Sequence, residues 1–381
     1  MISSKPLNVL ITQGESYTGQ TFARALRKQK KFVIGKLISV SDADRLYIAA
    51  NCDMKLFNKP FVVPFQGFAQ SLELLLDRES IDIAVPTCSD TDAQFLALIK
   101  HNKSPKEFSS DEAHPKIAVA DLSAVELAMD KWEFYNRFQG GFSLPTTYPV
   151  KIYSRNGCVY IESEFFSYRL EEQSLVRERQ ANPSLYRFVI KPRCLSGGMY
   201  YRNLTLEDLA DYLKEVGPNL WKLPKFSDDP DINFLMQVPI RGQEIIADSL
   251  SDEQKRVVSI VTRKMHKDRN NYSVGNVFSD SNLNVYLSDV LNATEISWFG
   301  NIDAILTEQG PVILEVNPRI GGSYGLSHSS GINFPLWMLE LFMEGKIQNL
   351  RKPRDGTYKQ GEYTAVDLIG LPHQTARGYI K

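Results

Sequence analysis

Several features that would define a function class are scarce in this sequence. It has four cysteines, which are far apart and never form a CxxC pair, and five scattered histidines. This pattern argues against a disulfide framework and a zinc site, and it predicts free thiols in a reducing compartment. No apolar run is long enough to span a bilayer, and no signal-peptide stretch follows Met1–Lys5. We therefore expect a cytoplasmic protein with no membrane partner.

An excess of charge of either sign is also lacking. The formal net charge is -1, which gives no electrostatic reason to expect nucleic acid or an anionic membrane as a partner. What is present is a composition usual for a globular protein, with 43% apolar and 23% charged residues. At 381 residues the chain is too long for one ordinary core, so we expect two or three structural units.

The first third of the chain alternates apolar, strand-like runs with helical segments. The expected strands cover residues 8–12, 36–40, 61–64 and 81–85. Such alternation is typical of a doubly wound parallel sheet, which we place at residues 1–120. After a helix near 123–138, short strands dominate from Tyr148 to Val316 and predict an antiparallel sheet with helices on one side. The expected fold class is therefore α/β plus α+β.

The most informative segment is VILEVNPR, residues 312–319. Because side chains alternate across a strand, Val312, Leu314 and Val316 would face the core. Glu315 and Asn317 would then share the opposite face and offer two hard oxygen ligands to one cation. Magnesium accepts such a set and completes its octahedron with water and phosphate oxygens.

The strand before it follows the same logic. A turn at 308–310 would join residues 301–306 to the metal strand as a hairpin and place Asp303 across from Glu315 and Asn317. Arg319 follows at the strand end, where its guanidinium suits a phosphate. An ordinary half-solvated hairpin is the alternative, and it would be preferred for any ExN taken alone. The four residues together favour a metal site.

With this arrangement the sequence resembles the ATP-grasp superfamily, particularly its carbamoyl-phosphate-synthase-like branch, over most of its length. The resemblance implies an ATP-grasp domain at 121–381 behind a Rossmann-like pre-ATP-grasp domain at 1–120. Within it, a nucleotide-binding lid would cover about 145–240 and a metal-binding part about 241–381. It further implies that the metal ligands are Asp303, Glu315 and Asn317, with Arg319 on the transferred phosphate.

Two further motifs resemble the phosphate-binding parts of the family. Asp130-Lys131, followed by GFSLP, would place Lys131 on the nucleotide phosphates, although a solvated helix lysine is an equally good interpretation. FVIKPRCLSGG would bring Lys191 to the phosphates from a strand. Its loop Ser196, Gly197 and Gly198 would fold over them, because backbone N–H groups of glycine-rich loops cradle anions.

The remaining motifs concern the nucleoside and the γ-phosphate. In LMQVPIRGQEIIAD, the backbone at Gln237 and Val238 would meet adenine and Glu244 the ribose hydroxyls. The family often has acidic residues near 237, and Pro239 removes one backbone donor here. In TRKMHK, Arg263 and Lys264 would lie near the γ-phosphate, although basic runs are usually just solvated.

Taken together, the resemblance implies an ATP-dependent ligase with ATP and Mg²⁺, or Mn²⁺ in its place, as cofactors. It would activate a small-molecule carboxylate as an acylphosphate, pass it to an amine, and release ADP and phosphate. The alternatives are phosphorylation of bicarbonate or carbamate, and a non-catalytic ATP-binding subunit. A homodimer is common among relatives. The loop 13–19 has two glycines but no GxGxxG, so NAD is not expected, and the PTCSD turn at 86–90 either touches substrate or is a plain turn.

Overall fold

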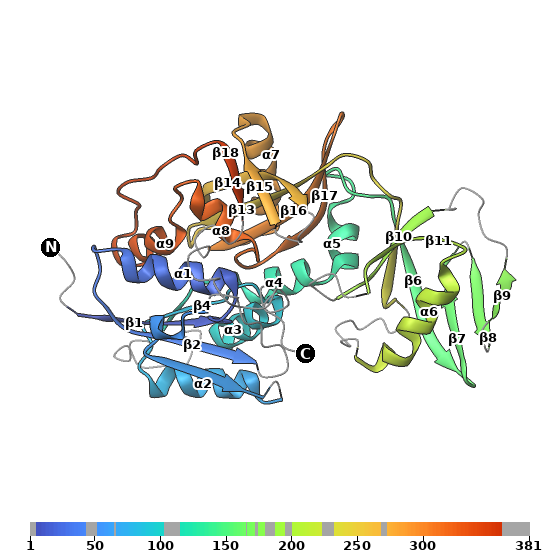
Figure 1. Ribbon diagram of the computed structural model, residues 1–381, viewed down its shortest axis with the longest axis horizontal. Helices are drawn as coiled ribbons and strands as arrows, with labels where there is room; N and C mark the ends of the chain where they lie inside the picture. The colour runs from blue at the N-terminus through green and yellow to red at the C-terminus, as the bar shows by residue number, and fades with distance from the viewer. Residues whose placement is uncertain are drawn as a thin grey trace, which may run out of the picture. The chain divides into compact units, whose positions relative to one another are not determined.

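The protein is described by a computed structural model that covers residues 5–42, 52–64, 66–102, 115–164, 166–171, 174–179, 187–194, 200–222, 232–267 and 273–359. The chain divides into two compact units, which Figure 1 shows in ribbon form. The first combines Met1–Glu126, Gln243–Asp303 and Val316–Lys381, and the second combines Leu127–Gly242 and Ala304–Glu315. This division groups most of the expected metal-binding part with the N-terminal domain, whereas the sequence reasoning grouped it with the lid.

The first unit begins with the expected parallel sheet. Its strands are β1 (Leu7–Thr12), β2 (Ile34–Asp42), β3 (Lys59–Val63), β4 (Ile83–Val85) and β5 (Lys116–Ile117), in the spatial order β3-β2-β1-β4-β5. Between them run α1 (Tyr17–Lys28), the 3₁₀ turn Met54–Leu56, α2 (Phe68–Arg78) and α3 (Asp90–Asn102). The strand order reverses between β1 and β4, so the doubly wound sheet expected from the sequence is confirmed.

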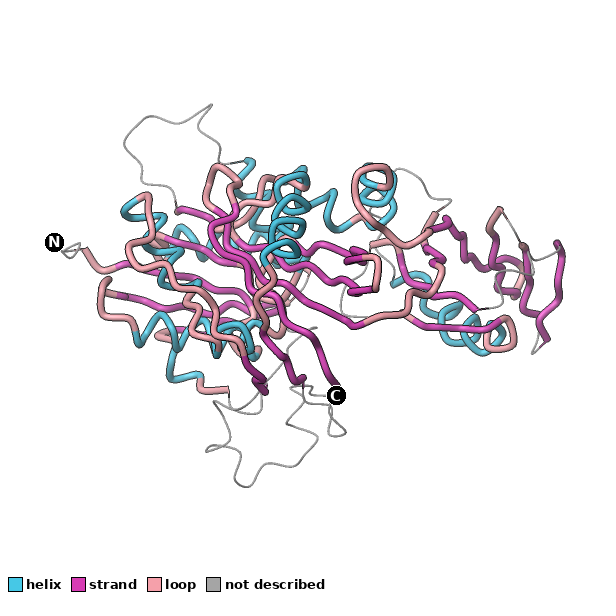
Figure 2. Tube along the Cα trace, turned by 90° about the horizontal axis from the view of Figure 1, so that it is seen from above, coloured by secondary structure: helices cyan, strands magenta, loops and turns pink. Residues whose placement is uncertain are grey.

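A second, mainly antiparallel sheet has the order β17-β16-β13-β14-β15-β18. Its strands are β13 (Gln243–Ser251), β14 (Val257–Lys267), β15 (Ser273–Val277), β16 (Phe299–Thr307), β17 (Gly310–Asn317) and β18 (Gly356–Lys359). It is accompanied by α7 (Ser281–Ala293), α8 (Tyr324–Ser329) and α9 (Phe334–Glu344). The turn between β16 and β17 forms the expected hairpin. Figure 2 shows the strands of the three sheets in magenta.

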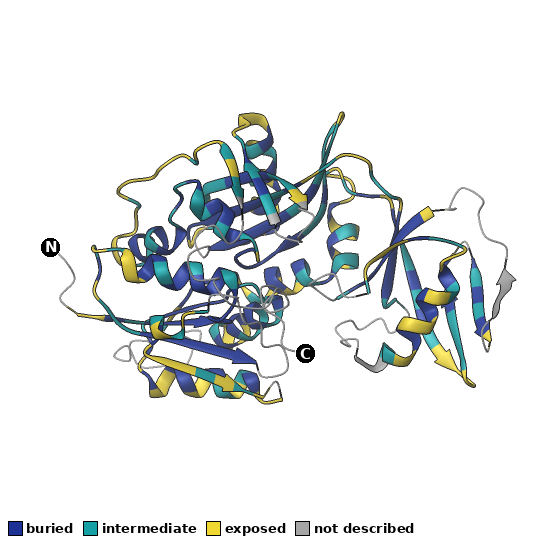
Figure 3. Cartoon of the chain, in the orientation of Figure 1, coloured by how far each residue is buried: buried dark blue, intermediate teal, exposed yellow. Residues whose placement is uncertain are grey.

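The hydrophobic core of the first unit explains why segments far apart in the sequence belong to it, because one cluster joins both sheets. Leu7, Phe22 and Leu37 from the N-terminal part share this cluster with Phe299 and Trp337 from the C-terminal part. The rings of Phe22 and Phe299 meet edge to face, with their centroids 5.9 Å apart. Burial of this shared apolar surface stabilises the two segments as one body, and Figure 3 shows the buried strands in dark blue.

The second unit contains a seven-stranded sheet with the order β11-β10-β12-β6-β7-β8-β9. Its strands are β6 (Thr147–Arg155), β7 (Cys158–Glu162), β8 (Ser167–Glu171), β9 (Ser174–Arg179), β10 (Arg187–Pro192), β11 (Arg202–Thr205) and β12 (Phe234–Gln237). The amphipathic helix α6 (Leu209–Val216) buries its apolar side chains in the same cluster as this sheet, and the 3₁₀ segment Gly217–Lys222 follows it. The predicted antiparallel region is therefore confirmed.

Two local expectations differ from the structure. The helix expected over 123–138 is two helices, α4 (Leu122–Met129) and α5 (Lys131–Phe138), because Asp130 leaves the helical conformation and caps α5. In β17, Val316 is buried as expected, but Val312 and Leu314 are only partly buried, and Ile313, which alternates with them, is buried instead.

None of the helices in the described part of the chain has the length and apolar character needed to cross a membrane.

Candidate active site

In the second unit, residues from three separate motifs meet at the end of β17. The Lys131 ammonium lies 3.6 Å from a carboxylate oxygen of Glu315, and the Lys191 ammonium lies 3.4 Å from the carbonyl oxygen of Leu314. The Lys131 side chain is 12% exposed and Lys191 is buried. Lys131 thus pairs with the carboxylate that the sequence assigned to a metal, and Lys191 contacts the backbone of the residue before it.

The position of Lys131 depends on a buried ion pair that the sequence reasoning missed. Asp130 accepts hydrogen bonds from the N–H groups of Trp132 and Glu133 and so caps α5. Arg193, one residue after β10, donates to Asp130 through Nε at 2.8 Å, and its carbonyl accepts the Lys131 N–H. The pair thereby ties the start of α5, and with it Lys131, to the strand that carries Lys191.

The predicted adenine segment has its polar groups engaged within the protein. Gln237 is buried and donates to the Thr147 hydroxyl at 2.9 Å. The Val238 N–H donates to the Thr146 carbonyl at 3.1 Å, so this donor already has a protein acceptor, and the side chain of Val238 is exposed. Glu244, in the first unit, is exposed at the start of β13. The predicted loop Ser196, Gly197 and Gly198 lies outside the described residues.

In the first unit, Asp303 and Asn317 converge from neighbouring strands. Asn317 Nδ2 lies 3.4 Å from Asp303 Oδ2, and Asn317 is buried while Asp303 is partly exposed. Glu315 lies two residues before Asn317 on β17 and is also partly exposed. Two carboxylates and one amide are hard oxygen donors of the kind that Mg²⁺ prefers, so the residues present fit this ion. The described residues hold no cluster of three or more His, Cys, Asp or Glu side chains that would suit another metal.

Arg319 forms an ion pair with the N-terminal domain. Its Nε lies 2.9 Å from Asp90 Oδ1, and both side chains are largely buried. Asp90, the last residue of the PTCSD segment, begins α3, and Thr87 in the same segment pairs as an isolated parallel bridge with Ile320. The turn that the sequence reasoning left between a substrate contact and a plain turn therefore lies against the end of the metal strand.

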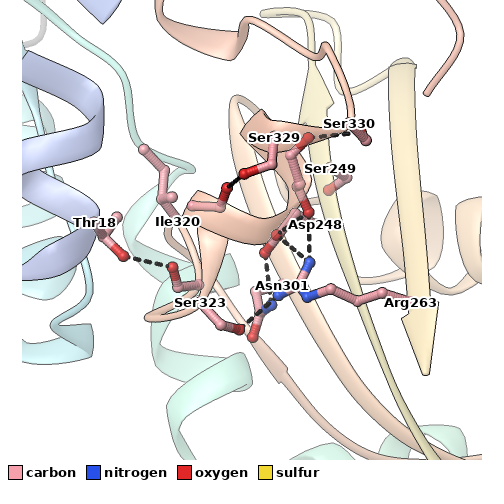
Figure 4. Close-up of polar contacts among 12 residues, drawn as sticks. Thr18, Asp248, Ser249, Arg263, Asn301, Ile320, Ser323, Ser329 and Ser330 are labelled. Atoms are coloured by element: carbon pink, nitrogen blue, oxygen red, sulfur yellow. Dashed lines mark hydrogen bonds and ion pairs between the residues drawn. The ribbon is translucent and has the colours of Figure 1, made fainter. Parts of the chain in front are cut away.

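Arg263 and Lys264 are neighbours on β14 but occupy different environments. Arg263 is fully buried and donates to Asp248, Ser323 and Ser327 (Figure 4). The ammonium of Lys264 lies 5.1 Å above the ring of Phe278, in a cation–π contact. A guanidinium enclosed in this way cannot also reach a γ-phosphate, so this position of Arg263 speaks against direct contact with the nucleotide. Asp248 was not predicted.

The four cysteines are free, as expected. Burial raises the pKa of the Cys88 thiol to about 12, and burial together with the nearby Asp130 carboxylate raises that of Cys194 to about 12. Burial likewise raises the pKa of Cys52 to about 11. Thiols with such pKa values are poor nucleophiles at neutral pH, so the structure offers no sign of covalent catalysis at these three cysteines.

Residues 232–362 match the family described as ATP-grasp in the biosynthetic pathway with Ter operon. No curated protein is detectably similar to the chain in sequence.

Among solved structures, the L-amino acid ligase from Bacillus licheniformis is similar, with a TM-score of 0.57 and 12% identity over 90% of this chain and 75% of that one. The N5-carboxyaminoimidazole ribonucleotide synthetase from Thermus thermophilus has a TM-score of 0.57 and 12% identity, over 92% and 81% of the two chains. Phosphoribosylglycinamide synthetase from Anaerococcus prevotii has a TM-score of 0.52 and 13% identity, over 88% of this chain and 75% of that one. At such identities the likeness shows the fold, which this chain shares with these enzymes, and the match to an ATP-grasp family model covers residues 232–362.

Proposed function

We propose that the protein is an ADP-forming ligase that uses ATP and Mg²⁺ to join a carboxylate to an amine. One observation carries the proposal. Lys131, Lys191 and Glu315, predicted from three motifs far apart in the sequence, come together within 3.6 Å contacts at residues 314–315. Two of the similar structures, an L-amino acid ligase and a phosphoribosylglycinamide synthetase, are by name enzymes that make bonds of this class.

The reaction would proceed in two steps. An oxygen of the substrate carboxylate attacks the γ-phosphorus of ATP, the bond to the β,γ-bridging oxygen breaks, and ADP leaves. The amine nitrogen then attacks the acyl carbon, loses a proton, and displaces phosphate. No nucleophile of the protein is needed, because positioning and charge neutralisation are nearly all that a protein contributes to phosphoryl transfer.

The residues of this chain would divide that work. Lys131 and Lys191 bind phosphate oxygens, and Arg319, held in orientation by Asp90, meets the transferred phosphoryl group. Asp303, Glu315 and Asn317 would hold Mg²⁺, which supplies positive charge to the phosphate oxygens when bound. Because the Glu315 carboxylate is already paired with Lys131, we expect that pair to rearrange when a cation or a phosphate arrives.

The test is a phosphate-release assay with ATP, Mg²⁺ and pairs of amino acids and small carboxylic acids. We expect release with at least one pair, and a fall by about 100-fold or more in Glu315→Gln and in Lys191→Ala. Two exposed residues of the second unit supply matched controls, Glu215→Gln and Lys214→Ala, which should retain the wild-type rate.

Three outcomes would contradict the proposal. Wild-type rates in folded Glu315→Gln or Lys191→Ala would remove these residues from the chemistry. Release that depends strictly on bicarbonate would indicate the carbamoyl-phosphate type of reaction. Nucleotide binding without turnover across the whole screen would indicate a non-catalytic ATP-binding subunit.

A further inference from the structure

A buried carboxylate in the first unit accepts hydrogen bonds from three different elements. Asp248, on β13, is 1% exposed and accepts from Arg263 Nη1, from the Ser327 hydroxyl at 2.7 Å and from Asn301 Nδ2 at 2.8 Å (Figure 4). The donors come from β14, α8 and β16. Because arginine stays protonated in proteins, Arg263 keeps a positive charge beside this carboxylate.

A second link connects this network to the predicted metal ligands. Asn301 Oδ1 accepts from Asn317 Nδ2 at 3.2 Å, and the same Asn317 nitrogen lies 3.4 Å from Asp303 Oδ2. The Asn301 amide therefore joins Asp248 to Asn317. Asp248, Asn301 and Asn317 are all buried, so water does not substitute freely for any member.

The order of donors and acceptors along this series follows from chemistry. An ionised carboxylate can only accept, so Asn301 must turn its NH₂ group toward Asp248. The side-chain carbonyl of Asn301 then faces Asn317, which must donate a hydrogen bond to it from its own NH₂ group. Asp303 as a second acceptor reinforces that orientation. The carbonyl oxygen of Asn317 is the one atom of its amide left for a cation, and the nitrogen would be useless to Mg²⁺.

We propose that Asp248 is a positioning residue that sets the amide polarity of Asn317 through Asn301, so that Asn317 presents oxygen to Mg²⁺. The inference rests on the proposed function and deepens it. Arg263 belongs to the same hydrogen-bond network, because its buried guanidinium holds the Asp248 carboxylate in place. Arg263 would therefore support the metal site indirectly, through Asp248, whereas the sequence analysis placed it near the γ-phosphate.

Close packing makes this device rigid. A Cβ atom added to Gly321 would come within 2.5 Å of Asn301 Nδ2 and 2.6 Å of Asp248 Oδ1. The segment that follows the metal strand thus lies directly on the hydrogen bond between Asp248 and Asn301. Rotation of either side chain out of the series is blocked from that side, so the orientation of the amides is maintained before any cation binds.

The experiment measures how much Mg²⁺ strengthens nucleotide binding. Calorimetry gives the Kd of a non-hydrolysable ATP analogue in EDTA and in saturating Mg²⁺, and the ratio of the two is the enhancement by the cation. Damage to folding or to the nucleotide site changes both Kd values, whereas a misdirected cation ligand lowers the ratio itself. Thermal unfolding without nucleotide reports folding separately.

Two variants interrupt the series in different ways. Asp248→Asn introduces an NH₂ donor at position 248. The side-chain amides of Asn301 and Asn317 could then both flip, which would direct the Asn317 nitrogen at the cation. Asn301→Ala removes the link while the pair of Asp248 and Arg263 stays intact. We expect either change to lower the enhancement ratio by about tenfold or more, the usual effect of losing a group that orients a metal ligand.

An exchange of the residues at positions 248 and 301 provides the most discriminating test. In the double variant Asp248→Asn with Asn301→Asp, the carboxylate at 301 accepts from both neighbours, so Asn317 again offers its oxygen. Volume and net charge are unchanged, and we expect the enhancement ratio to recover most of its wild-type value. Ser249→Ala and Ser330→Ala serve as controls, because both hydroxyls are buried nearby but bond only to carbonyls outside the series.

The outcomes separate the two proposals. Wild-type protein that binds the analogue equally well with and without Mg²⁺, or not at all, would overturn the proposed function and this inference with it. Wild-type enhancement that persists in Asp248→Asn and in Asn301→Ala would overturn this inference alone. If Asp248→Asn fails to fold, Asn301→Ala decides, and an unchanged ratio in that variant refutes the role of the series.

Discussion

Substitution of Gly321 by alanine tests the packing on which the buried network depends. The new methyl group would lie 2.5 Å from Asn301 Nδ2 and 2.6 Å from Asp248 Oδ1, well inside van der Waals contact. Neither atom belongs to a freely moving side chain, because the two form a buried hydrogen bond of 2.8 Å. Overpacking of this kind costs about 1–3 kcal/mol, and breaking a hydrogen bond to a charged group would move the cost to the upper end of that range.

Gly322 provides the matched control. A Cβ atom there would meet no atom of the described residues within 4 Å, and neither glycine has a left-handed backbone conformation. We expect Gly322→Ala to stay within about 0.5 kcal/mol of wild type. Urea unfolding followed by tryptophan fluorescence measures both free energies of unfolding. Equal stabilities of Gly321→Ala and Gly322→Ala would refute the reasoning, because the same substitution at adjacent positions would then be insensitive to the contacts described.

Three further predictions concern other parts of the molecule. Burial lowers the pKa of His328 below its ordinary value of 6.5. As the pH falls, the unfolded chain therefore binds this proton before the folded chain does. The stability that the neutral ring contributes is complete above pH 6.5 and is lost as the pH falls through the folded pKa. Denaturation at several pH values should show a shallower decrease in His328→Gln, and equal slopes would contradict this. Because burial raises the pKa of Cys88 and Cys194 to about 12, both should react with a thiol reagent at pH 8 far more slowly in the folded protein than in guanidinium, and equal rates would contradict this. Asp130→Ala should destabilise the second unit by about 3 kcal/mol in urea, because it removes the closer partner of the buried Arg193 and leaves only the more exposed Glu133, at 3.3 Å. A loss below about 1 kcal/mol would mean that the pair contributes little.

The arrangement of elements could be predicted where the signal is local. Apolar runs such as NVLIT marked the strands of the parallel sheet, and the turn at 308–310 marked the hairpin of β16 and β17. The grouping of the units could not be predicted, because it depends on contacts such as that of Phe22 with Phe299, which are far apart in the sequence. The break at Asp130 was missed although it has a local signal. Asp130 and Glu133 have the spacing of a helix capping box.

The candidate site shows the same division. The alternation of Glu315 and Asn317 on one strand is a local property, and the hairpin brings Asp303 to Asn317 without any distant contact. The burial of Arg263 is not local, because it requires an acceptor on another strand. A signal did exist in IIADSL, where Asp248 interrupts a run of apolar residues. A carboxylate inside a buried strand needs a buried cation, and this requirement could have led to Arg263.

The pairing of β13 with β14 explains why Arg263, and not Lys264, meets that carboxylate. Asp248 lies opposite Val261 and Arg263 lies opposite Ile246, so the two charged residues are diagonal neighbours on one face of the sheet. A diagonal separation of about 7–8 Å is within reach of a long arginine side chain. Lys264 points to the other face, where it contacts Phe278. Strand alternation thus gives two adjacent basic residues different roles, and only the position of Asp248 reveals which of them serves the interior.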